Sequence, residues 1–447
     1  MSATPSELEP APHGASFSLS LPLSAAMAKR DLYYGWIVVG ATFLVMLTTA
    51  GVAGATGVFI TPLEKEFGWT AEQISLAFAL RIALFGLMGP FAAAFINRFG
   101  VRAVVAAAEL TIACGVLGSL FMTQVWQLVA LWGVVVGFGT GLVALVLGAT
   151  VATRWFVARR GLVVGMLTAS TATGQLVFLP LLAKLTEDHG WRAASALMLA
   201  MLLLAGIVAL LALRDRPSDV GLPAYGARNV EPPPEQDLSL AAMMASPLRT
   251  LYAVRTSRTF WVLFATFFVC GLSTNGLIQT HWISLCGDYG IAPVSAAGAL
   301  AAIGMFDFVG TILSGWLSDR YDNRWLLFVY YGLRGLSLIW LPTSDFSVVA
   351  LSAFTVFYGL DWVATVPPTV RLTAQRFGAE KTNLVFGWIF AAHMVGAAAA
   401  ALGAGAARTE LATYLPALYV AGVACVVAAA LALTIGRAQP KATPIAA

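Results

Sequence analysis

Charged residues are scarce in this 447-residue chain: Asp, Glu, Lys and Arg together make up 11% of it, whereas 59% of the residues are hydrophobic. About 25% of the residues in a soluble globular protein are charged, so the composition excludes that class. Most of the chain consists instead of apolar runs about as long as the ~20 residues that a helix needs to cross a bilayer. The composition therefore predicts an integral membrane protein.

Histidine and cysteine are also rare, with four of each. The four histidines are too scattered for a paired-His metal site or a catalytic cluster. The cysteines lie in or beside apolar runs without metal-ligand spacing, which is typical of packing thiols. The longest hydrophilic stretch is residues 214–257, which leaves no room for a sizeable signalling domain. We therefore expect neither an enzyme nor a receptor, and no metal or cofactor.

Twelve apolar blocks follow one another along the chain. They cover residues 33–58, 72–97, 101–122, 125–151, 160–184, 191–213, 258–284, 294–317, 323–343, 346–374, 382–406 and 412–435. A membrane β-barrel would show short alternating segments, and the sequence has none. The pattern predicts an all-α membrane protein with twelve transmembrane helices.

The basic residues predict the orientation of these helices. Of the 26 Lys and Arg residues, two lie inside apolar blocks, 20 lie in one set of connections and 4 in the alternate set. Because cytoplasmic loops are rich in Lys and Arg, both termini are expected to be cytoplasmic. Residues 1–28 lack the basic start of a signal peptide and contain Glu7 and Glu9. The net charge of +4 thus reflects membrane topology and gives no reason to expect nucleic acid binding.

The chain repeats itself at an offset of 222 residues. The matching pairs include Gly68 and Gly290, Arg98 and Arg320, Arg102 and Arg324, Arg154 and Arg376, and Gly165 and Gly387. One ungapped offset that aligns separate regions indicates two six-helix halves in the same orientation. The predicted segments are an N-terminal tail (1–30), a first bundle (31–213), a cytoplasmic loop (214–257), a second bundle (258–436) and a C-terminal tail (437–447).

The loop at 214–257 contains RDRPSDVG and EPPPE, and we expect it to be too polar and proline-rich to pack. Its last part, DLSLAAMMASPLRTLYAVRTSRTFW, predicts a short surface helix ahead of the 258–284 helix.

Six plus six helices in parallel repeats, joined by a long cytoplasmic loop, resemble the major facilitator superfamily. Its G-x-x-x-D-R-x-G-R-R motif is matched loosely after the 294–317 helix, by GWLSDRYDNR with Asp322 at a glycine position. The first half matches less well, as INRFGVR with Asn97 at the acid position. The resemblance implies that the loop residues Arg98, Arg102, Asp319, Arg320 and Arg324 control gating.

A second stretch narrows the resemblance. RWFVARRGLVVGMLTASTATG, residues 154–174, is similar to the segment entering the fifth helix of monocarboxylate transporters and their oxalate/formate antiporter relatives. That branch places an Arg one turn after the acid of its eighth helix, where this chain has Thr311, and a Lys in its first helix, near Gly54 here. The acid is therefore present without its usual partners, and the resemblance leaves the solute open.

The acid in question is Asp307, within GMFDFVGTILSGWLSDR. It lies 12 residues before Asp319, about 18 Å from the end of the helix and near the bilayer midplane. A charge there costs about 3 kcal/mol, so it is expected to be functional. One alternative is a polar clamp in which Asp307 binds an Arg for packing alone. Arg334 is the natural partner of either Asp307 or Asp361.

Other polar residues within the apolar blocks complete the candidate site. The candidate proton carriers are Asp307 and Asp361, and the candidate substrate-binding residues are Arg334, Arg81, Asn275, Gln279, Thr311, Gln175, Ser170 and His393. Arg81 could instead snorkel outward. Glu109, seven residues from Arg102, is expected to support the loop motif.

Together these features predict a monomeric secondary active transporter of the cytoplasmic membrane that works by alternating access. The resemblance implies that its partners are the lipid bilayer, protons and a small organic solute, with a monocarboxylate or related organic anion favoured. A proton-driven exporter of drugs or metabolites is the alternative. Asp307 is the proton carrier we favour, because burial favours a protonated carboxyl group and a nearby Arg favours the ionised form.

Overall fold

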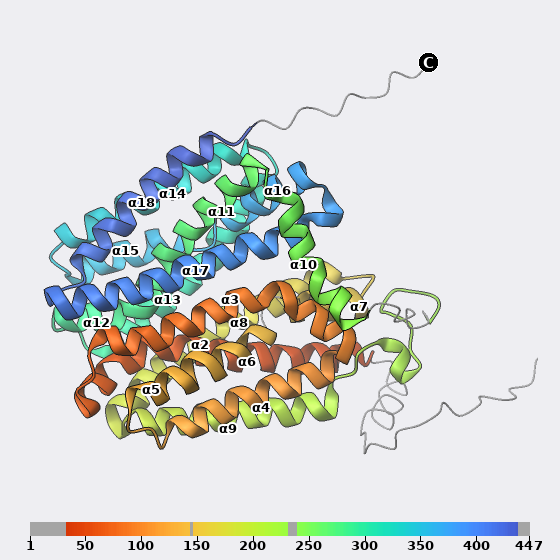
Figure 1. Ribbon diagram of the computed structural model, residues 1–447, viewed down its shortest axis with the longest axis horizontal. Helices are drawn as coiled ribbons and strands as arrows, with labels where there is room; N and C mark the ends of the chain where they lie inside the picture. The colour runs from red at the N-terminus through yellow and green to blue at the C-terminus, as the bar shows by residue number, and fades with distance from the viewer. Residues whose placement is uncertain (1–32, 144–145, 231–238, 437–447) are drawn as a thin grey trace, which may run out of the picture.

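The computed structural model describes residues 33–143, 146–230 and 239–436, and within them the protein is a bundle of long helices without strands (Figure 1). The helices of the first half are α2 (Gly35–Phe67), α3 (Ala71–Phe99), α4 (Val101–Ser119), α5 (Val125–Leu128), the π-helix η1 (Val129–Val136), α6 (Gly137–Leu142), α7 (Val146–Trp155), α8 (Arg160–His189) and α9 (Trp191–Ala212).

The second half begins after the connecting segment, which contains the short 3₁₀ turn η2 (Pro217–Val220) and α10 (Leu240–Val254). Its helices are α11 (Arg258–Gly271), the π-helix η3 (Leu272–Gln279), α12 (Thr280–Asp288), α13 (Pro293–Ser318), α14 (Asn323–Trp340), the 3₁₀ turn η4 (Leu341–Thr343), α15 (Val348–Asp361), α16 (Val366–Phe377), α17 (Ala379–Leu411) and α18 (Leu415–Leu433).

Eleven helical stretches in the described part of the chain are long and apolar enough to cross a membrane. The remaining predicted span, 160–184, corresponds to α8, whose 30 residues give a length of about 45 Å. Its sequence is interrupted by Ser170, Thr171 and Thr173. The predicted all-α architecture of two six-helix bundles is confirmed, and the exact segment boundaries stay predictions.

The two halves repeat each other in their contacts as well as in their sequence. A Cβ atom added to Gly137 would lie 2.9 Å from Arg81 Cα, and one added to Gly359 would lie 3.1 Å from Ile303 Cα. Both residues of the second pair are offset by 222 from those of the first. Glycine lets two helix backbones approach this closely, so the repeat predicted from sequence is present in the packing.

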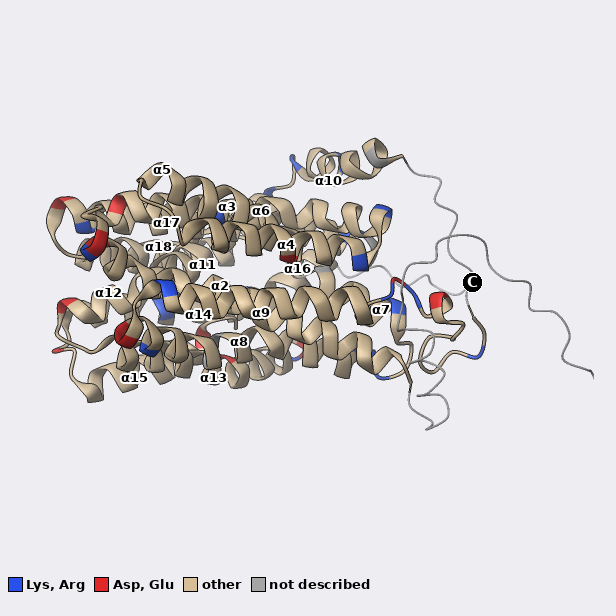
Figure 2. Ribbon diagram, turned by 90° about the horizontal axis from the view of Figure 1, so that it is seen from below, with Lys and Arg blue, Asp and Glu red and all other residues tan. Residues whose placement is uncertain are grey.

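The two ends of the bundle differ in charge (Figure 2). We call the end that carries Arg98, Arg154, Arg320 and Arg371 the basic end and the opposite one the far end. At the far end Arg192 pairs with Glu66 at 2.5 Å. The assignment of the basic end to the cytoplasm stays a prediction.

The halves contact each other at the far end. Thr61 of α2 lies 3.3 Å from Ser284 of α12, oxygen to oxygen. The backbone amide of Glu72 in α3 donates a 3.1 Å hydrogen bond to the hydroxyl of Thr409 in α17. The passage between the halves is therefore closed at this end.

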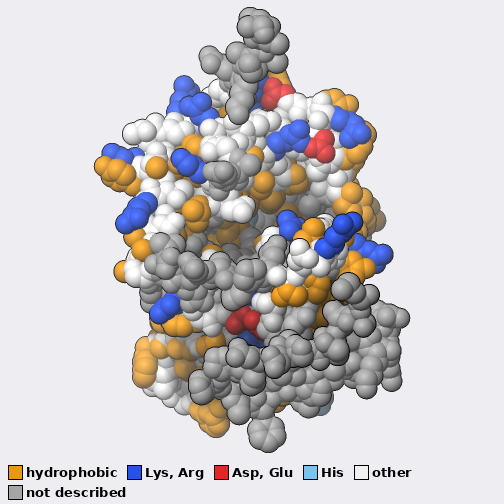
Figure 3. Space-filling view, turned by 90° about the vertical axis from the view of Figure 1, so that its right-hand side faces the viewer, with side chains coloured by type: hydrophobic (Ala, Val, Ile, Leu, Met, Phe, Trp, Pro, Cys, Tyr) orange, Lys and Arg blue, Asp and Glu red, His pale blue; other side chains and the backbone are white. Residues whose placement is uncertain are grey.

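On the side of α8 the halves separate towards the basic end, whereas α3 and α17 stay packed against each other as far as Phe91 and Trp388. In the part of α8 nearest that end, residues 162–168, only Val163 and Leu167 are buried, whereas Leu179, Leu182 and Ala183 near the far end are buried against neighbouring helices. Figure 3 looks onto the basic end and shows a hollow between the two halves, with Lys and Arg side chains around it. The protein is thus open to the basic end.

The expectation that the 214–257 loop does not pack is wrong for its first part. The amide of Tyr225 donates a 2.8 Å hydrogen bond to the carbonyl of Trp155, and Val157 donates back to Tyr225 at 3.0 Å. Asp215 accepts a 3.0 Å hydrogen bond from the amide of Arg102. Backbone pairing fixes this polar segment to the first half.

The short helix predicted before the seventh span is confirmed as α10. It lies across α3 and α17 at the basic end, so it touches both halves. The Trp388 indole of α17 donates a 2.8 Å hydrogen bond to the carbonyl of Pro247.

Candidate functional site

A buried ion pair lies at the centre of the second half. Arg334 Nε donates to Asp361 Oδ2 at 2.6 Å, and the two side chains are 0% and 9% exposed. Arg334 is eleven residues into α14, about 16 Å from its start. The sequence left Asp307 and Asp361 open as partners of Arg334. In the structure, Arg334 pairs with Asp361.

The pair stands at a break in the tenth span. α15 ends at Asp361 and α16 begins at Val366, and Pro367 and Pro368, which lack amide protons, follow at once. Arg334 Nη2 donates to the carbonyl of Asp361 and, at 3.1 Å, to that of Trp362. In the membrane interior such free carbonyls need a partner, and the guanidinium supplies it.

Asp307 also binds the segment between α15 and α16. Its Oδ1 accepts hydrogen bonds from the amide of Val363 at 2.9 Å and from the hydroxyl of Thr311 at 3.0 Å. The alternative clamp, in which Asp307 binds an Arg, is not seen in the described part of the protein, because the carboxylate binds a backbone amide and a hydroxyl group of neighbouring residues instead. No described residue forms an ion pair with Asp307.

A thiol connects the ion pair to the seventh span. Arg334 Nη1 donates to Cys270 Sγ at 3.0 Å, and Thr365 in the break lies 3.3 Å from the same sulfur. Cys270 is the penultimate residue of α11, and η3 begins two residues later at Leu272. Its position in this network has no signal in the sequence.

A second set of polar groups lies on η3 and α17. Asn275 Oδ1 lies 2.9 Å from His393 Nε2, and Asn275 Nδ2 donates to Gln279 Oε1 at 2.5 Å. Because an amide oxygen only accepts, this contact places the His393 proton on Nε2. His393 Nδ1 is buried and has no partner in the part of the protein that the structure describes.

Glycines bring these two elements together. A Cβ at Gly271 would clash with the carbonyl of His393, and one at Gly276 with that of Ala397. η3 is a π-helix, a form that often marks functional sites. Three of the predicted residues, Asn275, Gln279 and His393, thus form one cluster.

Arg81 lies in the first half and does not snorkel. It is 6% exposed, its Nε atom has no hydrogen-bond partner, and no described carboxylate pairs with it. The next residue, Ile82, packs in one cluster with Met394 and Ala397 of α17. Since Met394 adjoins His393, Arg81 lies at the depth of the His393–Asn275 contact. We call Arg81 and Asp307, which lack an ion pair among the described residues, the two solitary charges.

The structure does not bring every predicted residue into this region. Ser170 is buried in α8, and its hydroxyl donates to the carbonyl of Leu167 at 2.6 Å, so it is satisfied within its own helix. Gln175 lies in α8, and its side chain is outside the described part of the protein. Thr311 serves Asp307.

The predicted gating residues gather at the basic end. Arg98 and Arg102 lie at the junction of α3 and α4. Asp319 pairs with Arg371, Arg324 pairs with Asp322 at 2.5 Å, and Arg320 donates to the carbonyl of Trp316 at 3.2 Å. Each of these contacts lies within the second half. Their gating role stays a prediction.

Glu109 was misjudged from the sequence. It is 1% exposed in the middle of α4, and its Oε1 accepts a 3.2 Å hydrogen bond from Thr49 of α2. Its Oε2 has no partner in the described residues. It therefore does not support the loop motif. The presence of an acid inside an apolar run was the sequence signal that could have predicted its burial.

Comparison with known proteins agrees with this architecture. The family model described as "Major Facilitator Superfamily" matches residues 40–401. An uncharacterized MFS-type transporter of Bacillus subtilis, YcxA, is 24% identical over 368 residues, 81% of this chain and 86% of that protein. Monocarboxylate transporter 13 of Bos taurus is 25% identical over 410 residues, 90% of this chain and 89% of that one. The crystal structure of a D-xylose-proton symporter superposes with a TM-score of 0.70 at 15% identity, over 91% of this chain and 99% of that one.

Proposed function

The chain belongs to the Major Facilitator Superfamily and is a multi-pass secondary transporter, and from that premise we propose that it moves a small monocarboxylate-like anion together with a proton. The observation that carries the proposal is the placement of the two solitary charges, a cation in the first half and an acid in the second.

Arg81 is the residue that binds the anion. An isolated charge in a low-dielectric site is strongly unfavourable, so a buried guanidinium without a described carboxylate partner calls for an anionic ligand. A carboxylate matches a guanidinium in geometry as well as charge. The amides of Asn275 and Gln279, in the cluster with His393, provide hydrogen bonds for a hydroxyl or keto group of the solute.

Asp307 is the residue that binds the proton. Arg334 is already neutralised by Asp361, whereas Asp307 is bonded to neutral groups of the α15–α16 break. A rearrangement of this break changes the groups around Asp307, and with them its affinity for a proton. One proton moved with one monoanion carries no net charge across the membrane.

The relatives support the choice of solute and of coupling. One is named a monocarboxylate transporter, and the structural neighbour is titled a proton symporter. If the basic end faces the cytoplasm, the conformation seen here is open inward, with the outer contact of Thr61 and Ser284 closed.

Uptake into proteoliposomes tests the proposal. Small radiolabelled carboxylates, a neutral sugar and a cationic dye are offered with a pH gradient, acidic outside. For one proton per anion, each pH unit supports about tenfold accumulation, because one pH unit is worth about 1.4 kcal/mol. A valinomycin-imposed membrane potential should have no effect, since the moving complex is neutral.

The variant Asp307→Asn should lose accumulation driven by the pH gradient and keep exchange of labelled for unlabelled anion, which needs no change in protonation. Wild-type accumulation in this variant would rule out Asp307 as the proton carrier. Transport of the dye out of the vesicles without carboxylate uptake would favour the exporter.

A further inference from the structure

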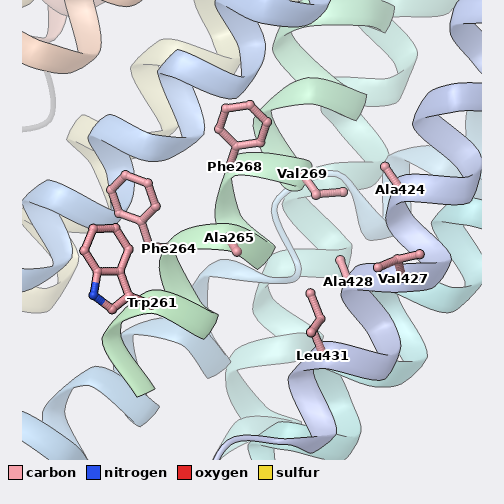
Figure 4. Close-up of a pocket in the computed structure, with 9 residues that line it drawn as sticks. All are labelled: Trp261, Phe264, Ala265, Phe268, Val269, Ala424, Val427, Ala428 and Leu431. Carbon is pink, nitrogen blue, oxygen red and sulfur yellow. The ribbon is translucent and has the colours of Figure 1, made fainter. Parts of the chain in front are cut away.

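A groove of about 490 Å³ lies between α11 and α18, on the outside of the second half (Figure 4). Trp261, Phe264 and Phe268 line it from α11, and Ala424, Ala428 and Leu431 line it from α18. All of these side chains are apolar, and the alanines form a low wall opposite the rings. The groove therefore suits a hydrocarbon chain.

The groove runs from the basic end towards the middle of the membrane. α11 and α18 are antiparallel here, so Trp261 and Leu431 lie at the same level near the basic end, and Phe268 and Ala424 lie deeper. Seven residues separate Trp261 from Phe268, which corresponds to about 10 Å. This direction is that of a lipid acyl chain.

The mouth of the groove is basic. Arg258 is exposed one turn before Trp261, and Arg255 is exposed with its guanidinium 3.5 Å from the centroid of the Tyr252 ring, where it donates a 2.8 Å hydrogen bond to the Tyr252 carbonyl. The Trp261 indole donates a 2.6 Å hydrogen bond to the carbonyl of Arg255, which fixes the ring to this edge. Arg258 is the first residue of α11, whose N-terminal end favours negative charge. The sequence has no acidic residue from 238 to 287 or beyond Glu410, so neither wall offers a carboxylate to these arginines or to a lipid cation.

We propose that this groove is a binding site for an anionic phospholipid, with its phosphate on Arg255 and Arg258 and one acyl chain between α11 and α18. The apolar channel requires a chain, and the two arginines, which form no ion pair within the described residues, favour a headgroup with net negative charge. Free phosphate lacks the first feature, and a zwitterionic lipid lacks the second.

The site adjoins the polar network. Val269, at the deep end of the groove, precedes Cys270, which accepts a hydrogen bond from Arg334. A lipid chain in the groove thus packs on the turn of α11 that leads into η3. Occupancy is expected to stabilise the position of α11 relative to α18, and so to set the rate of conformational exchange without contributing to solute binding.

Quenching of Trp261 by brominated acyl chains tests the site directly. The protein is reconstituted in phosphatidylcholine with increasing fractions of brominated phosphatidylglycerol or brominated phosphatidylcholine. The Trp261 signal is the difference between wild type and Trp261→Phe. We expect half-maximal quenching at a several-fold lower fraction of the anionic lipid, and equal curves for the two lipids would overturn the proposal.

Variants distinguish the contribution of the lipid headgroup from that of the acyl chain. The double variant Arg255→Gln and Arg258→Gln should abolish the several-fold preference for the anionic lipid, because it removes both positive charges at the headgroup, and the corresponding Lys pair should retain it. Arg249→Gln, an exposed arginine elsewhere on α10, is the matched control. An unchanged preference in the Gln pair would contradict the proposal.

Filling the groove with Ala428→Phe should remove quenching of Trp261 by both lipids. Ala107→Phe, at an exposed position on α4, should leave it intact. Quenching that persists when the groove is filled would mean that the bromine atoms reach Trp261 from bulk lipid, and would exclude a chain bound in the groove.

Discussion

Replacing Asp361 by Asn removes the charge that neutralises Arg334 while keeping the shape of the side chain. The amide oxygen of Asn can still accept from Arg334 Nε, and the carbonyls of Asp361 and Trp362 and the sulfur of Cys270 still surround the guanidinium. The variant therefore isolates the loss of charge. Removing one partner of a buried ion pair lowers the free energy of unfolding by about 3–5 kcal/mol. Because the other acceptors around Arg334 remain, we expect a value near the lower end of this range.

Arg334→Met removes the other partner of the pair, and it should lower the free energy of unfolding by a similar amount for a different reason. It leaves a buried carboxylate alone and also frees two carbonyls of the α15–α16 break, each worth about 1–3 kcal/mol when buried without a partner. The double variant Arg334→Met and Asp361→Asn restores neutrality but still lacks a donor for those carbonyls. It should thus be more stable than the sum of the single effects predicts, by about 2 kcal/mol.

Thermal unfolding in detergent, followed by tryptophan fluorescence, measures these differences. For a unit of 150–250 residues, 1 kcal/mol corresponds to about 2–4 °C, so Asp361→Asn should lower the transition by about 6–12 °C. Asp345→Asn, which alters an exposed acid of the same half that caps a backbone amide, is the control and should shift it by less than about 2 °C. A control-sized shift for Asp361→Asn, or strict additivity in the double variant, would refute the reasoning.

Three further outcomes follow from the same contacts. Arg81→Gln should raise KM for the anion about 10- to 100-fold with little change in kcat, because a hydrogen bond to a charged group is worth about 1.5–3 kcal/mol; Arg81→Lys should recover part of this, and an unchanged KM would remove Arg81 from the site. Cysteines at Thr61 and Ser284, whose oxygens lie 3.3 Å apart, should cross-link under oxidation and block transport reversibly; full transport by the cross-linked protein would show that this end does not open. Glu109→Gln should leave the pH dependence of transport unchanged, since Glu109 is buried against Thr49 away from the solitary charges; a shifted profile would make it a second proton carrier.

The sequence predicted the scaffold well because its signals are local. Apolar length identifies the spans, and the offset of 222 residues identifies the repeat without reference to any long-range contact. The structure shows the same offset in packing, where Gly137 lies against Arg81 as Gly359 lies against Ile303. Depth along each predicted span could also be counted, so the positions of Asp307, Arg334 and Asp361 far from the ends of those spans could be predicted.

The pairing of those charges could not be predicted, because it depends on where a helix stops. Only the break after Asp361 exposes the carbonyls that hold Arg334 and the amide that holds Asp307. Pro367 and Pro368 predict an irregularity in the helix. They do not predict which side chains bind the backbone groups that it exposes. Cys270 illustrates the limit, since a thiol in an apolar run looks the same whether it packs against methyl groups or accepts a hydrogen bond from a guanidinium.

The repeat also shows why the charges are divided between the halves. At the positions equivalent to Arg334 and Asp361 the first half has Ile112 and Gly139, and these too are neighbours, since a Cβ at Gly139 would lie 2.7 Å from Ile112 Cγ1. Arg81 in turn corresponds to Ile303 in the second half. Equivalent backbone contacts thus carry an ion pair in one half and apolar side chains in the other. An anion bound to Arg81 and a proton bound to Asp307 would neutralise both halves at once, whereas either alone leaves one charge uncompensated as the halves rock. Because an uncompensated charge in the membrane interior is costly, this arrangement favours movement of the doubly loaded protein and so couples the anion to the proton.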